Sequence, residues 1–341
     1  MTRSRDVADT QDNLGGAVSP VTAGKNIVIN GGFDIWQRGT SIATTGGQTA
    51  DRWTTFTDSA TRTVSRQVTG DTTNLPFIQY AGRFQRASGN TSTGRLLMGQ
   101  SIESFNSIPF ASRTVTFSFY ARRGANYSST SNALGVYCAS GTGTDQNIFV
   151  GFTGQTPVIN TAVTLTTTWQ RFTTTGAVGA TATQLGFYFG YTPTGTAGAD
   201  DWFEVTGVQI ELGSAATPFA RAGGTLQGEL TACQRYYRRF TATANNQQFS
   251  AFGASVSTTQ AYIAFPVSTT MRVNPTSVDY SNLQITNWQS GGTVTSVSIS
   301  RSNDNLVNVL ATVASGLTAG SGYCIADNNV GSAFIGFSAE F

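Results

Sequence analysis

Residues 205–240, VTGVQIELGSAATPFARAGGTLQGELTACQRYYRRF, divide the chain into two parts. Apolar and polar side chains alternate from Val208 to Leu212, and this period of two predicts a half-buried strand, which we place at 202–212. Gly213 and Pro218 end the pattern, because both residue types interrupt regular structure. The stretch therefore predicts the last strand of one β domain and a linker that leads into a second domain.

The second half of this stretch holds the one convincing helical pattern in the sequence. Thr225 is suited to cap a helix, since its hydroxyl can accept from a free N–H of the first turn. Apolar residues follow on one helical face: Leu226, Leu230, Cys233 and Tyr237. Arginines close the segment, where positive charge suits the helix dipole: Arg235, Arg238 and Arg239. We predict a linker helix at 223–240, whose apolar face either packs on its own domain or forms an oligomer interface.

The rest of the chain predicts an all-β protein, because short Thr- and Val-rich runs alternate with glycines and polar turns. The clearest strand pattern lies at Thr114–Arg122, and further strands are expected at 26–30 and 148–153, among others. We predict an N-terminal arm at 1–24, a jelly-roll β-sandwich at 25–222, the short linker helix, and a second, smaller C-terminal β-sandwich at 241–341. The arm is either an unstructured tail or a segment that orders against another protein.

The composition excludes several classes of function. Charged residues make up 11% of the chain, against roughly 25% in a typical soluble domain. The net charge of +2 gives no electrostatic reason to expect a nucleic-acid partner. No apolar run approaches the ~20 residues of a membrane span, and the N-terminus lacks the apolar core of a secretory signal. We therefore expect neither nucleic-acid binding nor membrane insertion.

Catalytic chemistry is also not expected. The chain has no histidine, which excludes Ser-His-Asp and Cys-His mechanisms. Its three cysteines are far apart, and we interpret them as buried apolar residues: Cys138, Cys233 and Cys324. Asp200, Asp201 and Glu204 are candidates for a glycosidase pair, but neighbours in a strand point to opposite faces and cannot flank one bond. We predict no enzyme activity, no cofactor and no metal.

Several motifs nevertheless resemble known families. Asn30–Phe33 with Trp36, Asp51–Trp53, Val115–Arg122 and Thr168–Phe172 are similar to carbohydrate-binding jelly-roll modules. Gly207–Gly213, Ala216–Phe219 and Cys233–Tyr237 strongly resemble bacteriophage tail-fibre and related virion structural proteins, and 313–317 and 334–341 are similar to the ends of those proteins. The resemblance implies a non-enzymatic virion protein, made in the host cytoplasm and displayed on a tail or capsid as a homotrimer. Its arm at 1–24 is expected to dock on other virion proteins.

The same resemblance leaves a second function open, that of a host-glycan-binding module for receptor recognition. Aromatic rings on a β surface can stack on sugar faces, and the candidate contacts are Trp53, Trp202, Trp288 and Tyr191. Core packing is the alternative for each ring. Carbohydrate modules also often hold a structural calcium, for which Asp34 is the candidate ligand. Gly207 stands where the second carboxylate is expected, with Asp200, Asp201 and Glu204 as alternatives, and calcium needs about six to eight oxygen ligands.

Overall fold

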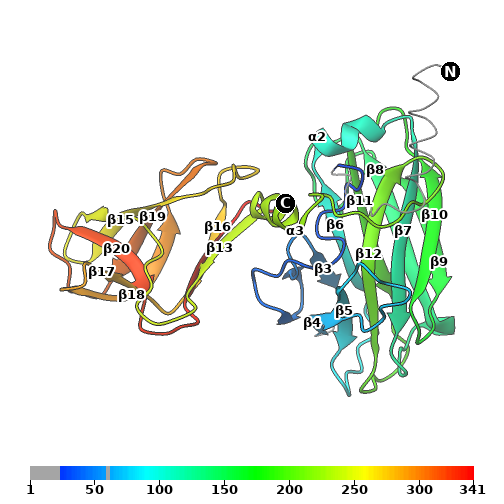
Figure 1. The fold of residues 1–341 in the computed structure, drawn as a ribbon, viewed down its shortest axis with the longest axis horizontal. Helices are drawn as coiled ribbons and strands as arrows, with labels where there is room; N and C mark the ends of the chain where they lie inside the picture. Colours follow the sequence, from blue (N-terminus) through cyan, green and yellow to red (C-terminus); the bar gives the residue numbers. More distant parts are fainter. Residues whose placement is uncertain (1–23, 59–61) are drawn as a thin grey trace, which may run out of the picture.

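A computed structural model of the chain describes residues 24–58 and 62–341. The expected docking arm therefore lies outside the described residues, except for Gly24. Figure 1 shows two β bodies arranged end to end, with the helix α3 (Leu226–Gln234) between them. We call them the N-terminal sandwich (residues 24–222) and the C-terminal body (237–341). The predicted all-β fold class is confirmed. In the described part of the chain no helix has the length and apolar character needed to span a membrane.

The N-terminal sandwich consists of two six-stranded antiparallel sheets. The first, sheet A, has the order β1 (Ser41–Thr44), β4 (Arg62–Val68), β5 (Tyr80–Arg86), β12 (Trp202–Leu212), β7 (Thr114–Arg123) and β10 (Gln170–Ala177). The second, sheet B, has the order β2 (Gly47–Gln48), β3 (Thr54–Thr57), β6 (Leu96–Ile102), β11 (Gln184–Tyr191), β8 (Ala133–Gly141) and β9 (Thr156–Thr164). Short helical segments follow β6 and precede β8: α2 (Ser104–Ser107), η1 (Ile108–Phe110) and η2 (Thr130–Asn132).

Aromatic side chains from the two sheets meet in the core. Phe117 of β7 lies 5.1 Å from Phe187 of β11, and Phe119 lies 4.7 Å from Phe189, measured between ring centroids. The alternation in Thr114–Arg122 directs these phenylalanines inward, so the prediction for this strand is confirmed. Each ring buries enough apolar surface to contribute about 2–3 kcal/mol to folding.

β12 begins and ends where the sequence predicted, but it is buried on both faces and not on one. Its outward residues Gln209 and Glu211 are covered by the segment after the strand, where Thr217 donates through N and Oγ1 to the Glu211 carboxylate at 2.9 and 2.6 Å. Gly207 adopts a φ of 56° at a bulge where the pairing with β7 shifts. Apolar and polar residues alternate in β12 because its polar side chains pair with polar groups of the segment that covers the strand, and not because they face solvent.

Two predicted strands are absent from the structure. Residues 26–28 are irregular and 29–30 form a turn, because the Asn26 side chain bonds to the backbone of Val208, Ile210 and Ala220 and Asn30 has a φ of 58°. Residues 148–153 form turns that cover the outer face of sheet B with two apolar side chains, Ile148 and Phe152. Both segments are apolar because they pack on a sheet, and not because they belong to one.

The C-terminal body is all-β, and its strands form a closed barrel with a small sheet beside it. The barrel has the order β14 (Gly253–Ser255), β15 (Gln260–Pro266), β19 (Leu306–Val313), β18 (Gly291–Ile299), β17 (Leu283–Thr286) and β20 (Gly322–Asp327). The three-stranded sheet has the order β13 (Tyr237–Thr241), β21 (Phe334–Ser338) and β16 (Ser277–Ser281). Phe337 of this sheet contacts Phe265 of the barrel at 5.0 Å, and the two therefore share one core.

The linker helix is shorter than predicted. Thr225 caps it as expected, since Thr225 Oγ1 accepts from Gly228 N at 3.0 Å. The helix ends at Gln234, however, and residues from Tyr237 onward belong to β13. The apolar pattern continues through Tyr237 because that ring is buried under the C-terminal body, where its hydroxyl donates to Asp279. Arg238 and Arg239 are therefore strand residues, and the predicted helix at 223–240 is wrong beyond residue 234.

A cluster of arginines joins the two bodies. Arg52 of the N-terminal sandwich is 3% exposed, pairs with the Glu340 carboxylate, and stacks on the Tyr236 ring at 3.5 Å. Arg38 approaches the same carboxylate at 3.6 Å and stacks on Tyr237 at 3.5 Å. These contacts are buried and directional, and we therefore interpret the two bodies as one rigid unit.

Asp51 lies in this joint and makes the stability of the protein depend on pH. Both of its carboxylate oxygens accept from Gln37, whose side chain also donates to Tyr237 O at 2.7 Å. Burial raises the pKa of Asp51 to about 6, from 3.8. The pKa of Asp51 is higher in the folded protein than in the unfolded chain. Its contribution to the free energy of unfolding is therefore complete below pH 4 and is lost as the pH rises through 6. The loss is on the order of 2–3 kcal/mol.

Urea unfolding at a series of pH values will test this, with Asp51→Asn as the reference for all other titrating groups. We expect the stability of the natural protein relative to Asp51→Asn to increase between pH 7 and pH 4. A difference that stays constant would show that folding does not shift the pKa of Asp51, and one that falls with acidification would show that folding lowers it; either result would contradict this assignment.

Candidate functional site

A hollow of about 190 Å³ lies on the outer face of sheet B. Its floor contains Gly135 of β8 and Gly190 of β11, which are paired directly across the two strands. A Cβ atom on Gly190 would lie 2.3 Å from the Leu97 side chain and 2.8 Å from Leu96 O, and one on Gly135 would lie 3.0 Å from Gly190 O. The close packing of the floor therefore requires glycine, and the absence of side chains leaves the sheet open to a ligand.

Two tyrosines stand beside this floor, and we call this stacked pair the tyrosine shelf. Tyr137 and Tyr188 are also direct cross-strand partners, and their rings stack with centroids 4.8 Å apart at 24°. Phe149 extends the aromatic surface, 6.0 Å from Tyr188. Both tyrosines are half-buried, so part of each side chain stays accessible. Burial raises the pKa of Tyr188, so its hydroxyl is protonated and can donate at neutral pH.

The rim of the hollow is polar and electrically neutral. Gln155 Nε2 donates to Tyr137 Oη at 3.1 Å, which fixes the orientation of that ring. Asn160, Thr161 and Thr192 are exposed along the edge. Arg95 is the charged lining residue, and Asp58 neutralises it through a 3.0 Å contact between Nε and Oδ2. An aromatic shelf with amides and hydroxyls around it can stack on the apolar face of an uncharged ring and hydrogen-bond to its substituents.

The residues predicted as glycan contacts do not gather at this hollow. Trp53 is wrong, because it is fully buried between the sheets and stacks on Phe33 at 4.5 Å. Tyr191 is also buried, since its ring packs on Tyr127 at 4.6 Å and reaches the hollow from beneath the sheet. Trp202 is half-buried under the Arg83 guanidinium, 4.1 Å from its ring. Trp288 alone of the four is exposed, and it lies in the C-terminal body.

Three of the four carboxylates considered for calcium or catalysis are held by arginines, and the fourth, Asp200, is exposed. Asp34 pairs with Arg221 at 2.7 Å, Asp201 with Arg86 at 2.7 Å, and Glu204 with Arg83 and Arg122 at 2.7 and 2.6 Å. Asp201 and Glu204 are also fully buried. Within residues 24–58 and 62–341, no three side chains of His, Cys, Asp or Glu lie together as a metal site. The arginines supply in these places the positive charge that a calcium ion would bring.

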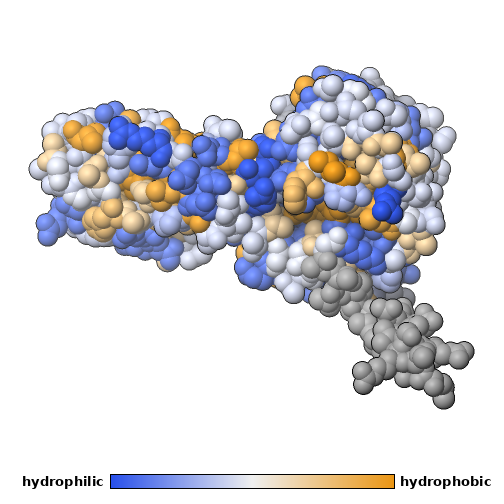
Figure 2. All heavy atoms as spheres, turned by 90° about the horizontal axis from the view of Figure 1, so that it is seen from above, coloured by the Kyte–Doolittle hydropathy of each residue, from blue (hydrophilic) through white to orange (hydrophobic). Residues whose placement is uncertain are grey.

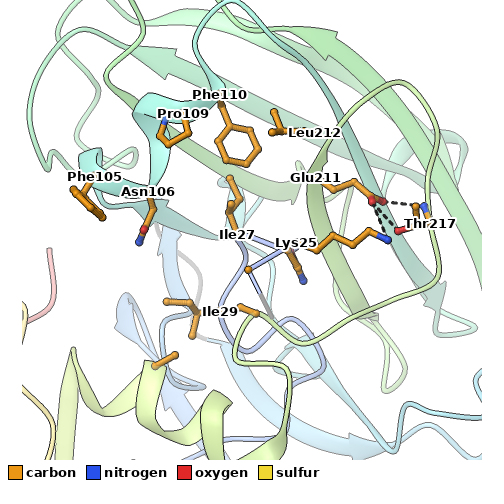
Figure 3. Close-up of a pocket in the computed structure, with 14 residues that line it drawn as sticks. Lys25, Ile27, Ile29, Phe105, Asn106, Pro109, Phe110, Glu211, Leu212 and Thr217 are labelled. Carbon is orange, nitrogen blue, oxygen red and sulfur yellow. Dashed lines mark hydrogen bonds and ion pairs between the residues drawn. The ribbon is translucent and has the colours of Figure 1, made fainter. Parts of the chain in front are cut away.

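A second and larger hollow, of about 690 Å³, lies beside α3 (Figure 3). Apolar side chains make up most of its wall: Ile27, Ile29, Phe105, Pro109, Phe110 and Leu212. Glu211 forms the polar edge, where it pairs with Lys25 at 3.5 Å and accepts from Thr217. Figure 2 looks onto this α2 end of the sandwich and shows apolar residues at the surface. Phe105, on the wall of this hollow, is 84% exposed.

The predicted oligomer interface lies on α3 but does not line this hollow; Leu226 borders a separate one together with Phe77 and Arg221. Leu226 is 57% exposed, and Leu230 is half-buried. Cys233 and Tyr237 are buried within their own chain, so their assignment to an interface is wrong. The apolar pattern of the helix did not show which partner its buried side faces. The side of α3 that holds Cys233 packs on the sandwich of its own chain, where Glu229 accepts from Gly223 N at 2.7 Å and from Asn30 N.

The tyrosine shelf was missed, although its signal is present in the sequence. Gly135-Val-Tyr137 and Tyr188-Phe-Gly190 carry the same two residue types in reverse order. An antiparallel pair of such strands places glycine against glycine and tyrosine against tyrosine on one face. Recognising this requires the pairing of β8 with β11, which the single sequence does not provide.

No family model matches this sequence, and no curated protein matches it. The solved structures similar to the chain include a CBM4 module, with 17% identity, a TM-score of 0.32, and coverage of 54% of this chain and 98% of the module. The CBM22-1 xylan-binding domain from Paenibacillus barcinonensis has 15% identity, a TM-score of 0.33, and coverage of 57% and 99%. Tailspike protein 4 of bacteriophage CBA120 has 14% identity, a TM-score of 0.35, and coverage of 55% of this chain and 21% of the tailspike domain.

Proposed function

We propose that this protein is a non-enzymatic, glycan-binding structural protein of a bacteriophage particle, of the tail-fibre, adaptor or capsid-decoration type. The observation that supports glycan binding is the stacked Tyr137–Tyr188 shelf beside the glycine floor of sheet B. The sequence motifs at 207–219 and 233–237, which resemble virion structural proteins, support the place on a particle. In this proposal the hollow contacts uncharged saccharide of the host surface, and the arm at 1–24 attaches the protein to the virion.

The geometry of the hollow favours binding without chemistry. A saccharide on the shelf would meet two tyrosine rings, side-chain amides and hydroxyls, and a guanidinium already neutralised by Asp58. Neither a carboxylate pair nor an unpaired general base faces the floor among the described lining residues. The shelf can thus orient a sugar ring and hold it, which is what an attachment protein requires.

Replacing Tyr188 with alanine tests this site. Loss of one stacked ring removes roughly 60–80 Å² of apolar contact, which corresponds to about 1.5–2 kcal/mol. We expect a roughly 10- to 30-fold rise in the Kd for the oligosaccharide that binds best, measured by calorimetry on the full chain. Tyr137→Ala should also weaken binding, because it removes the ring on which Tyr188 stacks.

Tyr80→Ala provides the matched control, since Tyr80 is a half-buried tyrosine on β5 of the opposite sheet. It should leave the Kd unchanged. The glycan-binding part of the proposal fails if a broad panel of bacterial surface saccharides gives no binding, or if Tyr188→Ala and Tyr80→Ala bind alike.

We further propose that the protein is displayed as a homotrimer, and that a neighbouring copy covers the apolar surface on the two sides of α3. The support is the exposure of Phe105 and Leu226, together with the apolar hollow between α3 and α2. Lys25 and Glu211 neutralise each other at its edge, so the surface presents no net charge against an identical copy.

Sedimentation of charged variants tests the assembly. Phe105→Asp and Leu226→Asp should convert trimers to monomers, because each places a charge against an apolar partner surface. Val150→Asp is the control, since Val150 is also highly exposed but lies in the β8–β9 connection. A natural protein that sediments as a monomer, or trimers that tolerate both variants, would overturn this part of the proposal.

A further inference from the structure

A second pair of exposed aromatic rings lies on the barrel of the C-terminal body. Phe252 is 54% exposed and Trp288 is 49% exposed. Phe252 directly precedes β14, and Trp288 follows β17 by two residues. Both strands pair with β20, which lies between them and begins at Gly322. The two rings therefore stand on either side of the start of β20, on strands about 10 Å apart.

A glycine, Gly322, lies at the start of β20 beside one of the two rings. A Cβ atom on Gly322 would lie 3.5 Å from a ring carbon of Phe252, so this position borders the Phe252 ring directly. The loops around it are tied together by hydroxyls: Ser255 Oγ donates to Ser321 O at 3.0 Å, and Ser290 Oγ bonds Tyr323 Oη at 3.0 Å. Gly322 thus carries no side chain beside the Phe252 ring, and hydroxyl groups connect the loops around it.

The turn that carries Trp288 is held in a fixed conformation. Trp288 has a φ of 69°, in the left-handed region that bulky residues rarely adopt. Thr286 Oγ1 accepts from Trp288 N at 2.8 Å, and Asn287 Oδ1 accepts from Ser290 N at 2.7 Å and Gln289 N at 3.0 Å. These bonds hold a large apolar ring in solvent in an unfavourable backbone conformation. Packing within the chain does not explain this arrangement, since half of the ring is uncovered.

This end of the barrel also lacks charge. The three segments that meet there, 249–260, 287–292 and 314–322, contain no Asp, Glu, Lys or Arg. Their polar groups are hydroxyls and amides. A partner recognised by charge, such as an acidic polysaccharide or a phosphate, finds no counterpart in these segments. A protein partner would favour a continuous apolar patch, whereas here a glycine and hydroxyls separate the two rings.

We propose that Phe252 and Trp288 form a second saccharide-binding site, for an uncharged oligosaccharide whose rings lie across Gly322. This site is independent of the hollow on sheet B, because it belongs to the other body and shares no residue with it. The C-terminal body is at the left of Figure 1, and this site would give each chain two saccharide contacts. Two contacts on one rigid chain strengthen attachment by raising the local concentration of the second.

Tryptophan emission of the full chain separates the two sites. Trp288 is the most exposed tryptophan, Trp36, Trp53 and Trp169 are buried, and the hollow on sheet B is lined by tyrosines. The probes are uncharged oligosaccharides of glucose, galactose, mannose and N-acetylglucosamine. We expect at least one to shift the emission to shorter wavelength with saturation, unaffected by about 0.5 M NaCl. Trp288→Phe should abolish the shift, and Phe252→Ala should raise the Kd about tenfold.

Tyr188→Ala should leave the Trp288 shift intact, so failure of the first site and failure of the second are distinguishable. The proposal is overturned if no member of the panel shifts the emission, or if the shift survives in Trp288→Phe and therefore arises at Trp202. It is equally overturned if a sulfated or carboxylated oligosaccharide is the preferred ligand, or if a purified host surface protein stripped of glycans binds here and no saccharide does.

Discussion

Asp201→Ala is expected to destabilise the N-terminal sandwich by about 3–5 kcal/mol, because it leaves a buried arginine without its counter-charge. Arg86 and Asp201 are both fully buried and form a 2.7 Å ion pair. Arg86 also donates through Nη2 to the carbonyls of Asn90 and Ser92, while Asp201 accepts from Ser128 N at 3.0 Å. The pair thus ties three connections to the end of sheet A. Chemical unfolding monitored by circular dichroism measures the loss.

Asp58→Ala is the matched control, since it breaks another Arg–Asp pair that lies at the surface. Arg95 and Asp58 retain 59% and 39% side-chain exposure, so water replaces the lost partner and stability should hardly change. If Asp58→Ala and Asp201→Ala lowered the free energy of unfolding equally, burial would not explain the importance of the Arg86–Asp201 pair.

Glu340→Ala is expected to have an effect of similar size, about 3–5 kcal/mol, located at the joint between the two bodies. The variant removes the carboxylate that pairs with Arg52 and approaches Arg38. Because Arg52 is buried under Tyr236, water cannot solvate its charge after the carboxylate has been removed. Two results are expected: a lower unfolding midpoint, and a wider range of molecular dimensions in small-angle scattering as the bodies lose their fixed orientation.

Glu340→Gln separates charge from hydrogen bonding in the joint. It keeps an acceptor for Arg52 and should therefore lose less stability than Glu340→Ala while showing the same direction in scattering. If both variants scatter like the natural protein and unfold at the same midpoint, the joint is held by other contacts, such as the pair of Arg235 with Glu103 at 3.0 Å.

The sequence predicted those features that depend on local pattern. The strands at 114–123 and 202–212 and the Thr225 cap were found because alternation and capping act over a few residues. The end of the helix was not found, because Tyr237 is apolar at helical spacing and equally suited to a strand. The pairing of β13 with β21, nearly a hundred residues later in the chain, decides between the two.

The candidate site was largely hidden from the sequence for the same reason. Trp53 directly precedes β3 and Tyr137 lies in β8, yet the first ring is buried between the sheets and the second lies outside them. Which face a strand turns outward depends on its neighbours, and a shift of one residue exchanges the faces. The exposed Trp288 was found as a candidate, whereas its partner Phe252 requires the barrel order that places β14 and β17 on either side of β20.

A crystal structure of the full chain with its best-binding uncharged oligosaccharide tests the central claim most directly. Our account predicts an intact sugar ring parallel to Tyr188, over the Gly135–Gly190 floor, with its hydroxyls bonded to Asn160 or Thr161. A saccharide bound only elsewhere on the sandwich, or one found cleaved in the hollow, would contradict the assignment of sheet B as a non-catalytic glycan-binding surface.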